Sequence, residues 1–379
     1  MDLLVALSLV INLGVPGRSN ANVSIAARDA FVAVVWSAST AQGTTDIYAA
    51  ASRDGGATFA SPVRVNSTEG DARVNGEQPP RVVLLQRAGG APSMVVLWTS
   101  KGSAGTTLLS ARSDDGGKTF SKSALVPDTD APGNRGWYSA AADGSGSVYA
   151  AWLDHREQES KLYVGSIADG LPAKGIAGVV CYCCKTAIAT GADDAIFTAW
   201  RHVYPGNVRD IAFSMSRDRG KTFAPPIRVS EDRWVLDGCP DDGPAMAIDT
   251  AGVAHVAWPS LVDRPEPHKE IFYAWTSDGR PFTPRVRITV AGRNAAHPQI
   301  VAHRAGVTVL WDEVVDGRRR VFARRRSRSN RNFAPVELSE PNVGAYYPVA
   351  AVVSDTIVAA WVQGSGPDSV IAVRRLPIR

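Results

Sequence analysis

Cysteine, methionine and histidine are scarce in this chain of 379 residues, which has four, four and six of them respectively. Four cysteines in a chain of this length exclude a small, disulfide-dense scaffold. Lys and Arg number 41 against 37 Asp and Glu, and this net charge of +4 excludes nucleic acid as a partner for the whole molecule. Hydrophobic residues make up 45%, which excludes disorder and indicates a large core.

Long apolar runs are also missing, because no stretch reaches the 18 consecutive apolar residues that a membrane span requires. The nearest candidate is residues 3–13, which are mostly apolar but short. Asp2 stands where a signal peptide would carry basic residues. Two interpretations stay open for this segment, a remnant signal peptide or a β-strand.

A short apolar run that ends in tryptophan recurs seven times along the chain. The seven tryptophans are Trp36, Trp98, Trp152, Trp200, Trp258, Trp311 and Trp361. They are separated by 62, 54, 48, 58, 53 and 50 residues, so each repeat unit has roughly the length of one small supersecondary motif.

Within a unit the order of apolar runs and turns is clearest in the fifth. Residues 244–248 and 253–258 form two apolar runs, and residues 270–275 and 285–289 form two more, with turn residues between them. Four short antiparallel strands per repeat are typical of a propeller blade. A single blade leaves both of its faces uncovered, so we expect the blades to stack around an axis and cover one another.

The repeats predict an all-β propeller that occupies residues 1–379 as one domain, with seven blades, or six if one tryptophan run is an insertion. The last unit supplies three strands before the chain ends, at residues 348–353, 356–361 and 369–375. Residues 1–14 precede the first unit. We expect them to provide the outer strand of the last blade, which would close the ring and remove an open sheet edge.

Three turns share the pattern S-x-D-x-G-x-T-F, at residues 52–59, 113–120 and 216–223, and degenerate copies occur at 276–282 and 327–333. These turns resemble the Asp boxes, or BNR repeats, of the sialidase superfamily. The Asp side chain can accept backbone hydrogen bonds across the turn, and glycine tolerates positive φ there. We expect these turns to be structural and to lie on the face opposite the binding face.

The loops on the other face collect acidic, basic, aromatic and sulfur-containing residues instead of ordinary loop residues. Tyr138, His297 and Tyr347 each stand 14 residues before their tryptophan, which predicts a shared register. The remaining polar groups of these loops are Trp137, Asp154, His155, Arg156, Arg201, His202, Asp312, Glu313 and Tyr346. Such a gathering on one mouth favours a functional site.

The sialidase resemblance implies particular roles for some of these residues. Enzymes of that family use a Tyr nucleophile helped by a Glu, an Asp acid/base and three arginines that hold the substrate carboxylate. The matching candidates are Tyr347 or Tyr346 as nucleophile, Glu313 as its helper, Asp154 as acid/base, and Arg156 and Arg201 as carboxylate ligands. The third arginine has no assignment, so hydrolysis of a glycan and binding of a glycan both remain open.

The cysteines support a rival hypothesis, a metal-binding or redox protein without glycosidase activity. Cys181, Cys183 and Cys184 form C-x-C-C, and Cys181 and Cys239 each stand 19 residues before a tryptophan, at equivalent places on adjoining blades. Thiolates with nearby histidines such as His297, His202 or His155 suit Cu(I) or Zn²⁺. Disulfides and buried thiols are the alternatives.

The partner expected from this sequence is a carbohydrate or another small anionic ligand, bound by a monomer. No cofactor is required unless the metal hypothesis holds. Paired cysteines and the Asp-box resemblance both favour a location outside the cytoplasm, in the periplasm or secreted.

Overall fold

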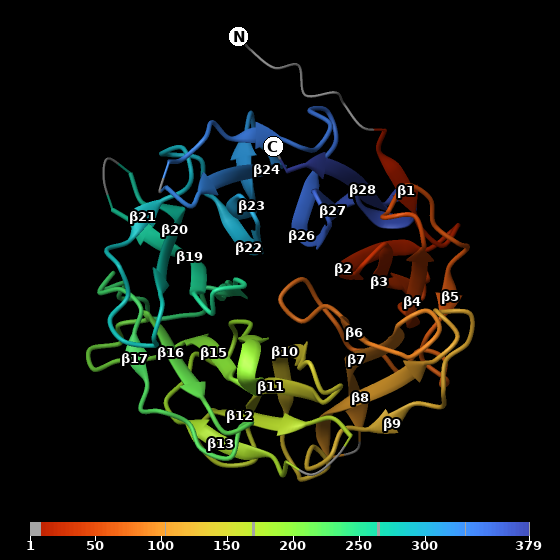
Figure 1. Ribbon diagram of the computed structural model, residues 1–379, viewed down its shortest axis with the longest axis horizontal. Coiled ribbons are helices and arrows are strands. Elements are labelled where there is room, and N and C mark those ends of the chain that lie inside the picture. The colour runs from red at the N-terminus through yellow and green to blue at the C-terminus, as the bar shows by residue number, and fades with distance from the viewer. Residues whose placement is uncertain (1–8, 103, 169–170, 264–265, 330, 379) are drawn as a thin grey trace.

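The computed structural model describes residues 9–102, 104–168, 171–263, 266–329 and 331–378. Within these ranges the strands form seven four-stranded antiparallel sheets around a central axis, which confirms the predicted seven-bladed all-β propeller (Figure 1). The helices in the described ranges are two single turns of 3₁₀ helix, η1 (Ala192–Asp194) and η2 (Gly366–Asp368). No helix in those ranges has the length and apolar character to cross a membrane.

The strands of each blade follow one another from the axis outwards. Blades 1 and 2 contain β2 (Ser19–Arg28), β3 (Phe31–Ser39), β4 (Thr45–Ser52), β5 (Val63–Arg64), β6 (Arg81–Leu85), β7 (Ser93–Gly102), β8 (Gly105–Ser113) and β9 (Ala124–Leu125). Blades 3 and 4 contain β10 (Arg135–Ala142), β11 (Val148–Asp154), β12 (Lys161–Ser166), β13 (Lys174–Ala177), β14 (Ala187–Thr190), β15 (Ile196–Arg201), β16 (Ile211–Ser216) and β17 (Ile227–Arg228). Blades 5 and 6 contain β18 (Ala245–Ile248), β19 (Ala254–Val262), β20 (His268–Thr276), β21 (Val286–Arg287), β22 (Ala296–His303), β23 (Gly306–Val315), β24 (Arg318–Ser327) and β25 (Val336–Glu337). Blade 7 contains β26 (Ala345–Val353), β27 (Thr356–Gln363), β28 (Val370–Pro377) and β1 (Ile11–Leu13).

The repeated tryptophans lie on the second strand of every blade and are at most 1% exposed. Each one packs in the interface between two sheets. Trp36 of blade 1, for example, belongs to one apolar cluster with Val358 and Val373 of blade 7. Strand β3 is buried along almost its whole length, because neighbouring blades cover both of its faces. This arrangement explains why the second strands are continuous apolar runs without strict alternation.

The N-terminal strand closes the ring, as the sequence predicted. Strand β1 pairs antiparallel with β28, with Ile11 opposite Val373 and Leu13 opposite Ile371. Residues 1–8 of the predicted closing segment lie outside the described residues. The closure joins the first part of the chain to the last and protects the edge of blade 7.

The S-x-D-x-G-x-T-F turns have a common hydrogen-bond pattern between the third and fourth strands. In the first of them, Asp54 accepts hydrogen bonds from the backbone N–H of Thr58 at 2.9 Å and from its hydroxyl at 2.6 Å. The Ser52 hydroxyl donates to Asp54 and accepts from the N–H of Gly56, which has a φ of 82°. The aspartate is therefore used to hold the turn.

The closing strand generates a stability prediction with a matched control. Leu13 is 8% exposed and packs in the interface of blades 1 and 7, whereas Leu9 is 90% exposed. Leu13→Ala should lower the free energy of unfolding by about 2–3 kcal/mol, since it leaves a cavity in a packed core. Leu9→Ala should change it by less than about 0.5 kcal/mol. Equal urea midpoints for the two variants would contradict the closure.

The turns also predict a dependence of stability on pH. Hydrogen bonds from Thr222 and Ser216 lower the pKa of Asp218 to about 2. Because the folded-state pKa lies below the unfolded value of about 3.9, the stabilisation is present above that value and is lost as the pH falls toward 2. Asp218→Asn should therefore lower the melting temperature at pH 7 and have a smaller effect at pH 3. Asp368→Asn, at an exposed position, is the control.

Candidate functional site at the propeller axis

A cavity of about 140 Å³ lies on the axis, near the ends at which the inner strands begin. All seven blades contribute to its wall. One lining residue from each blade, in order, is Val23, Arg81, Ser139, Ala187, Ala245, His297 and Tyr347. A site shared by seven strands is held by the packing of the whole ring, which favours fixed side-chain positions.

Four inner strands, β2, β10, β22 and β26, carry a β-bulge at the same place. The residues at the start of these bulges are Asn22, Trp137, His297 and Tyr347, with φ between 50° and 56°. Positive φ is unfavourable for residues with a side chain, and bulges often redirect a side chain beside a functional site. Here two of the four residues, His297 and Tyr347, line the axial cavity.

Tyr138 does not share the register of His297 and Tyr347, and this prediction was wrong by one residue. Trp137 occupies the bulge position instead, and Tyr138 is fully buried with its hydroxyl 3.5 Å from the carbonyl of Leu97. The cause is the hairpin between β10 and β11, which has five turn residues (143–147), whereas two residues join β22 to β23. A longer hairpin shifts the count back from the tryptophan.

The carboxylate of Asp312 holds His297 and Tyr347 together. Its Oδ2 lies 2.7 Å from Nδ1 of His297 and accepts a hydrogen bond of 2.9 Å from the backbone N–H of Tyr347. Its Oδ1 accepts a hydrogen bond from Arg319. Because a carboxylate only accepts, it fixes the proton of a neutral His297 on Nδ1 and leaves Nε2 as the basic nitrogen.

Asp242 supports the same histidine from blade 5. It is fully buried and accepts hydrogen bonds from the backbone N–H of His297 at 3.2 Å and from Nζ of Lys269 at 3.2 Å. Burial opposes its charged form, yet the nearby charges of Lys269, His297 and Lys185 hold the pKa of this carboxyl below its usual value. Asp242 therefore remains ionised beside the cavity at neutral pH.

The ring of Tyr347 lies against His297, with centroids 3.9 Å apart, and reaches the loop between β5 and β6. A Cβ on Gly76 would stand 2.4 Å from the Tyr347 hydroxyl, so this position requires glycine for space. Burial, together with the negative charges of Glu77, Asp312 and Asp242, raises the pKa of Tyr347 well above its usual value. The phenol is therefore protonated at neutral pH.

Glu77 is a central residue that sequence reasoning missed. Its loop extends into the middle of the ring between β5 and β6 (Figure 1). The buried carboxylate accepts backbone N–H bonds from Lys185 at 3.3 Å and Gly243 at 3.1 Å, and Nζ of Lys185 lies 3.5 Å away. Glu77 stands in a loop that leads into an inner strand, the same class of loop that gave the other candidates, so its position was an available signal.

Glu313, the predicted helper of the tyrosine, lies apart from His297 and Tyr347. Consecutive residues of a strand point to opposite faces, so Glu313 of β23 faces away from the side on which Asp312 meets the histidine. Its oxygens accept hydrogen bonds from Nε1 of Trp311 at 2.7 Å and from Arg293 at 3.0 Å. These contacts are those of a buried residue that links a core tryptophan to a loop.

Asp154 and Arg156 belong to a buried ion network in blade 3. The Asp154 carboxylate accepts from Arg135 at 3.2 Å, from Arg156 at 2.7 Å and from Nε1 of Trp152 at 2.9 Å. Burial opposes the charged form of Asp154, but the hydrogen bonds from Arg156 and Trp152 lower the pKa of this carboxyl. Arg156 also covers the ring of Tyr163, 4.5 Å from its centroid.

Arg201 and Tyr346 also lie away from the axial cavity. Arg201 is 2% exposed and donates to the carbonyls of Asp242, Arg209 and Pro259. The ring of Tyr346 packs against the apolar cluster between blades 1 and 7. Among the six residues predicted to be catalytic, Tyr347 is the one that lines the axial cavity in the described part of the chain.

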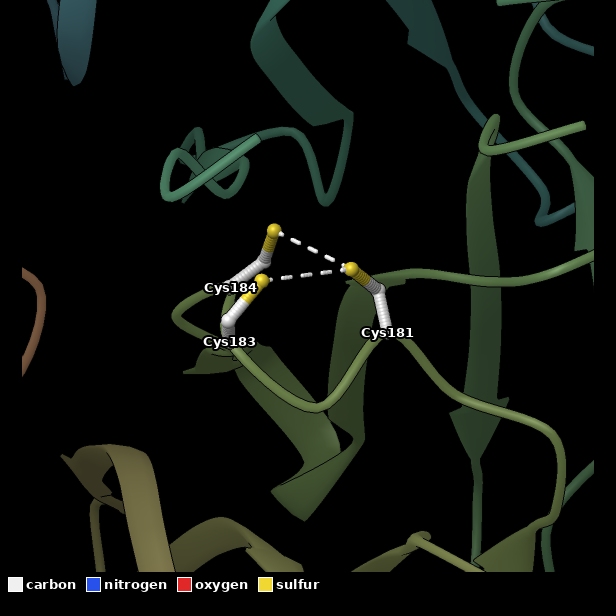
Figure 2. Close-up of side chains that lie close together, drawn as sticks. All are labelled: Cys181, Cys183 and Cys184. Atoms are coloured by element: carbon white, nitrogen blue, oxygen red, sulfur yellow. Dashed lines mark hydrogen bonds between the residues drawn. The ribbon is translucent and has the colours of Figure 1, made fainter. Parts of the chain in front are cut away.

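The four cysteines converge on the wall between blades 4 and 5, as their equivalent registers predicted. Cys183 and Cys239 form a disulfide with a Cα–Cα distance of 6.0 Å. Cys181 and Cys184 are free and buried, and Sγ of Cys181 lies 3.5 Å from Sγ of Cys184 and 3.7 Å from Sγ of Cys183 (Figure 2). The disulfide removes Cys183 and Cys239 from the predicted set of thiolate metal ligands.

The histidines predicted as further metal ligands have other contacts. Nδ1 of His297 is taken by Asp312, and His202 packs edge-on against Tyr204, with ring centroids 4.6 Å apart. His155 lies 3.0 Å from the hydroxyl of Ser160. The structure thus offers a disulfide and a neighbouring dithiol at this wall, without a described histidine bonded to the sulfurs.

The blade 3 network generates a prediction that separates a structural from a catalytic role. Asp154→Asn should lower the free energy of unfolding by about 3–5 kcal/mol, because Arg135 would be left buried without its counter-charge. The exposed Asp130→Asn should have almost no effect. Urea unfolding measures both variants. A catalytic Asp154 would instead show unchanged stability together with loss of activity.

The sequence matches no known protein family and no curated protein. Solved structures of similar fold include an ulvan lyase of the polysaccharide lyase family PL25, with a TM-score of 0.65 and 11% identity over 97% of this chain and 96% of that chain. The polysaccharide lyase Uly1 has a TM-score of 0.62 and 10% identity over 95% and 90% of the two chains. An α-L-arabinanase of Penicillium chrysogenum, complexed with arabinobiose, has a TM-score of 0.55 and 14% identity over 98% of each chain. Identities this low establish a common propeller fold.

Proposed function

We propose that this protein binds an acidic polysaccharide across the axial face and cleaves it with His297 and Tyr347. The observation that carries the proposal is the pair itself, a basic imidazole nitrogen and a protonated phenol side by side in a cavity lined by all seven blades. One carboxylate, Asp312, orients both residues. Paired proton donors and acceptors on fixed backbones are the requirement for general acid–base catalysis.

The reaction that best suits this pair is β-elimination at a uronic acid. Nε2 of His297 would remove the proton on the carbon next to the carboxylate. The C–H electrons would form the new C=C bond while the bond to the glycosidic oxygen breaks. The Tyr347 hydroxyl would protonate that leaving oxygen, and the proton taken by His297 would then restore the phenol. Its raised pKa suits Tyr347 to the role of acid.

Positive charge near the cavity supports an anionic substrate. Lys185 and Arg81 line the wall, and a cation beside a uronate carboxylate favours removal of the neighbouring proton. The similar structures add support, since one PL25 ulvan lyase is described as bound to a glycan containing GlcA. The fold relation carries no specificity by itself, so the substrate is inferred from the site.

Hydrolysis by a sialidase-like mechanism is the second candidate, because Tyr347 is in the cavity where a nucleophile would be needed. Two contacts argue against it. Arg156 and Arg201, which would hold the substrate carboxylate, are committed to Asp154 and to backbone carbonyls. Glu313, which would activate the tyrosine, is bonded to Trp311 and Arg293.

We also propose that the protein acts outside the cytoplasm as a monomer and needs no metal for glycan cleavage. The Cys183–Cys239 disulfide supports an oxidising compartment. Fractionation of cells that express the chain with its natural upstream region, followed by gel filtration, tests both statements.

The activity is tested on ulvan, with neutral arabinan and an aryl sialoside as comparison substrates. We expect new reducing ends on ulvan together with the ultraviolet absorbance of an unsaturated uronate. His297→Gln and Tyr347→Phe should each lower the rate by about 100-fold to 10,000-fold, the usual contribution of a general acid or base. Tyr163→Phe, a tyrosine stacked on Trp152 away from the cavity, should retain the rate.

The outcomes separate the alternatives. Reducing ends without the absorbance would replace elimination by hydrolysis, and release from the sialoside would favour the sialidase-like reaction. Cleavage that persists in both His297→Gln and Tyr347→Phe would overturn the assignment of the site, and neither binding nor cleavage of any of the three substrates would overturn the proposal.

A further inference from the structure

Cys181 and Cys184 have a feature that the C-x-C-C pattern conceals, because they are themselves spaced as C-x-x-C. Their sulfurs are 3.5 Å apart and within hydrogen-bond distance (Figure 2). Both residues are 1% exposed, and both precede β14 on the wall of the mouth. The neighbouring Cys183 is already paired with Cys239, so it does not compete for either sulfur.

The surroundings of the two thiols are unequal. Nη1 of Arg209 donates to Sγ of Cys181 at 3.1 Å, and Arg209 is itself held by the carbonyl of Leu236 and the side chain of Asn207. The hydrogen bond from Cys184, with the charge of Arg201 and the bond from Arg209, lowers the pKa of Cys181 to about 6. Burial raises the pKa of Cys184. One sulfur is thus a thiolate and its neighbour a thiol at neutral pH.

Apolar groups cover the pair. Trp137 and Val203 pack against the three cysteines of the loop, and Trp137 is held by its backbone bonds to Gln78 and Thr186. A buried site with this cover excludes protein thiols and large reagents, whereas a molecule the size of a peroxide needs little space. A thiolate beside a second thiol is the arrangement found where a sulfenic acid is resolved to a disulfide.

We propose that Cys181 and Cys184 form a second, redox-active pair that a hydroperoxide closes to a disulfide while the Cys183–Cys239 bond stays intact. Cys181 is the attacking residue and Cys184 the resolving residue. The inference rests on the sulfur geometry and its cover, and it is independent of the glycan chemistry at the axis.

The reaction balances with the hydroperoxide as oxidant. The Cys181 thiolate attacks the terminal oxygen of the hydroperoxide, the O–O bond breaks, and an alkoxide or hydroxide leaves and takes a proton from solvent. Cys181 is then a sulfenic acid. The sulfur of Cys184 attacks Cys181, the S–O bond breaks, and the departing hydroxide leaves as water with the proton of Cys184. Two electrons pass from the pair to the oxidant.

Closure of the pair acts on the wall of the axial cavity. Lys185 and Thr186 directly follow Cys184, and both line that cavity. The backbone N–H of Lys185 donates to Glu77, and Thr186 bonds to the carbonyl of Trp137. Bringing the two sulfurs from 3.5 Å to the bonded distance of about 2.05 Å moves the loop at the point where these contacts begin.

The test uses the full-length protein with hydrogen peroxide as the probe. Thiols are counted by alkylation after unfolding, and disulfides are located by mass spectrometry. We expect two free thiols, Cys181 and Cys184, before treatment and none afterwards, with a loss of two hydrogens and a new Cys181–Cys184 bond. A protein isolated without free thiols, from which a mild reductant first releases these two, gives the same support.

Variants assign the roles. Cys184→Ser should accumulate a sulfenic acid on Cys181 that a sulfenic-acid-specific reagent traps, and Cys181→Ser should form none on Cys184. The double variant Cys183→Ser/Cys239→Ser should still close the remaining pair, which separates the two bonds. Hydrogen exchange of residues 181–188 should change on closure in the wild type and not in Cys184→Ser.

Three results would overturn the inference. The first is that both thiols persist in the folded protein under excess peroxide while an exposed model thiol is consumed. The second is a new bond between Cys181 and Cys183 with release of Cys239. The third is one tightly held metal ion per chain that protects the thiols until a chelator removes it, which would make the cluster a metal site.

Discussion

Mutual cover of the blades is the constraint on which the rest of the molecule depends. Each sheet carries apolar side chains on both faces, and only the next blade can bury them. A row of blades would leave two faces open, whereas a ring leaves none. The tryptophans fill these interfaces, and β1 supplies the strand that completes the last blade. The axis is the geometric result, because seven inner strands must then converge.

The candidate site arises where that regular arrangement is broken. Four inner strands depart from regular pairing at one level, and the bulges carry residues with side chains at positive φ. Such conformations cost roughly 1–3 kcal/mol each and persist when the surroundings hold them. Asp312 provides part of that hold, since it binds the backbone of Tyr347 and the ring of His297 at once. The ring supplies rigidity, and the bulges supply chemistry.

Much of the fold was predictable because its signal is periodic. The tryptophan register gave the blades, their number and the closing strand, and equal offsets placed Cys239 beside the other cysteines. The site depends on single-residue differences that periodicity does not resolve. One extra residue in a hairpin put Trp137 where Tyr138 was expected. Strand alternation joined Asp312, and not Glu313, to the histidine, and a long loop brought Glu77 from another blade.

Glu77 has a consequence for how the ring comes apart. Blades in a propeller otherwise interact with their immediate neighbours, so their stability is close to a sum of local terms and a ring of this kind is able to open one interface at a time. Glu77 starts from the loop before blade 2 and accepts hydrogen bonds from the loops that enter blades 4 and 5. Separating those blades would strand a buried carboxylate without its donors. The ring therefore has a spoke as well as a rim, and unfolding at distant interfaces becomes a single cooperative event.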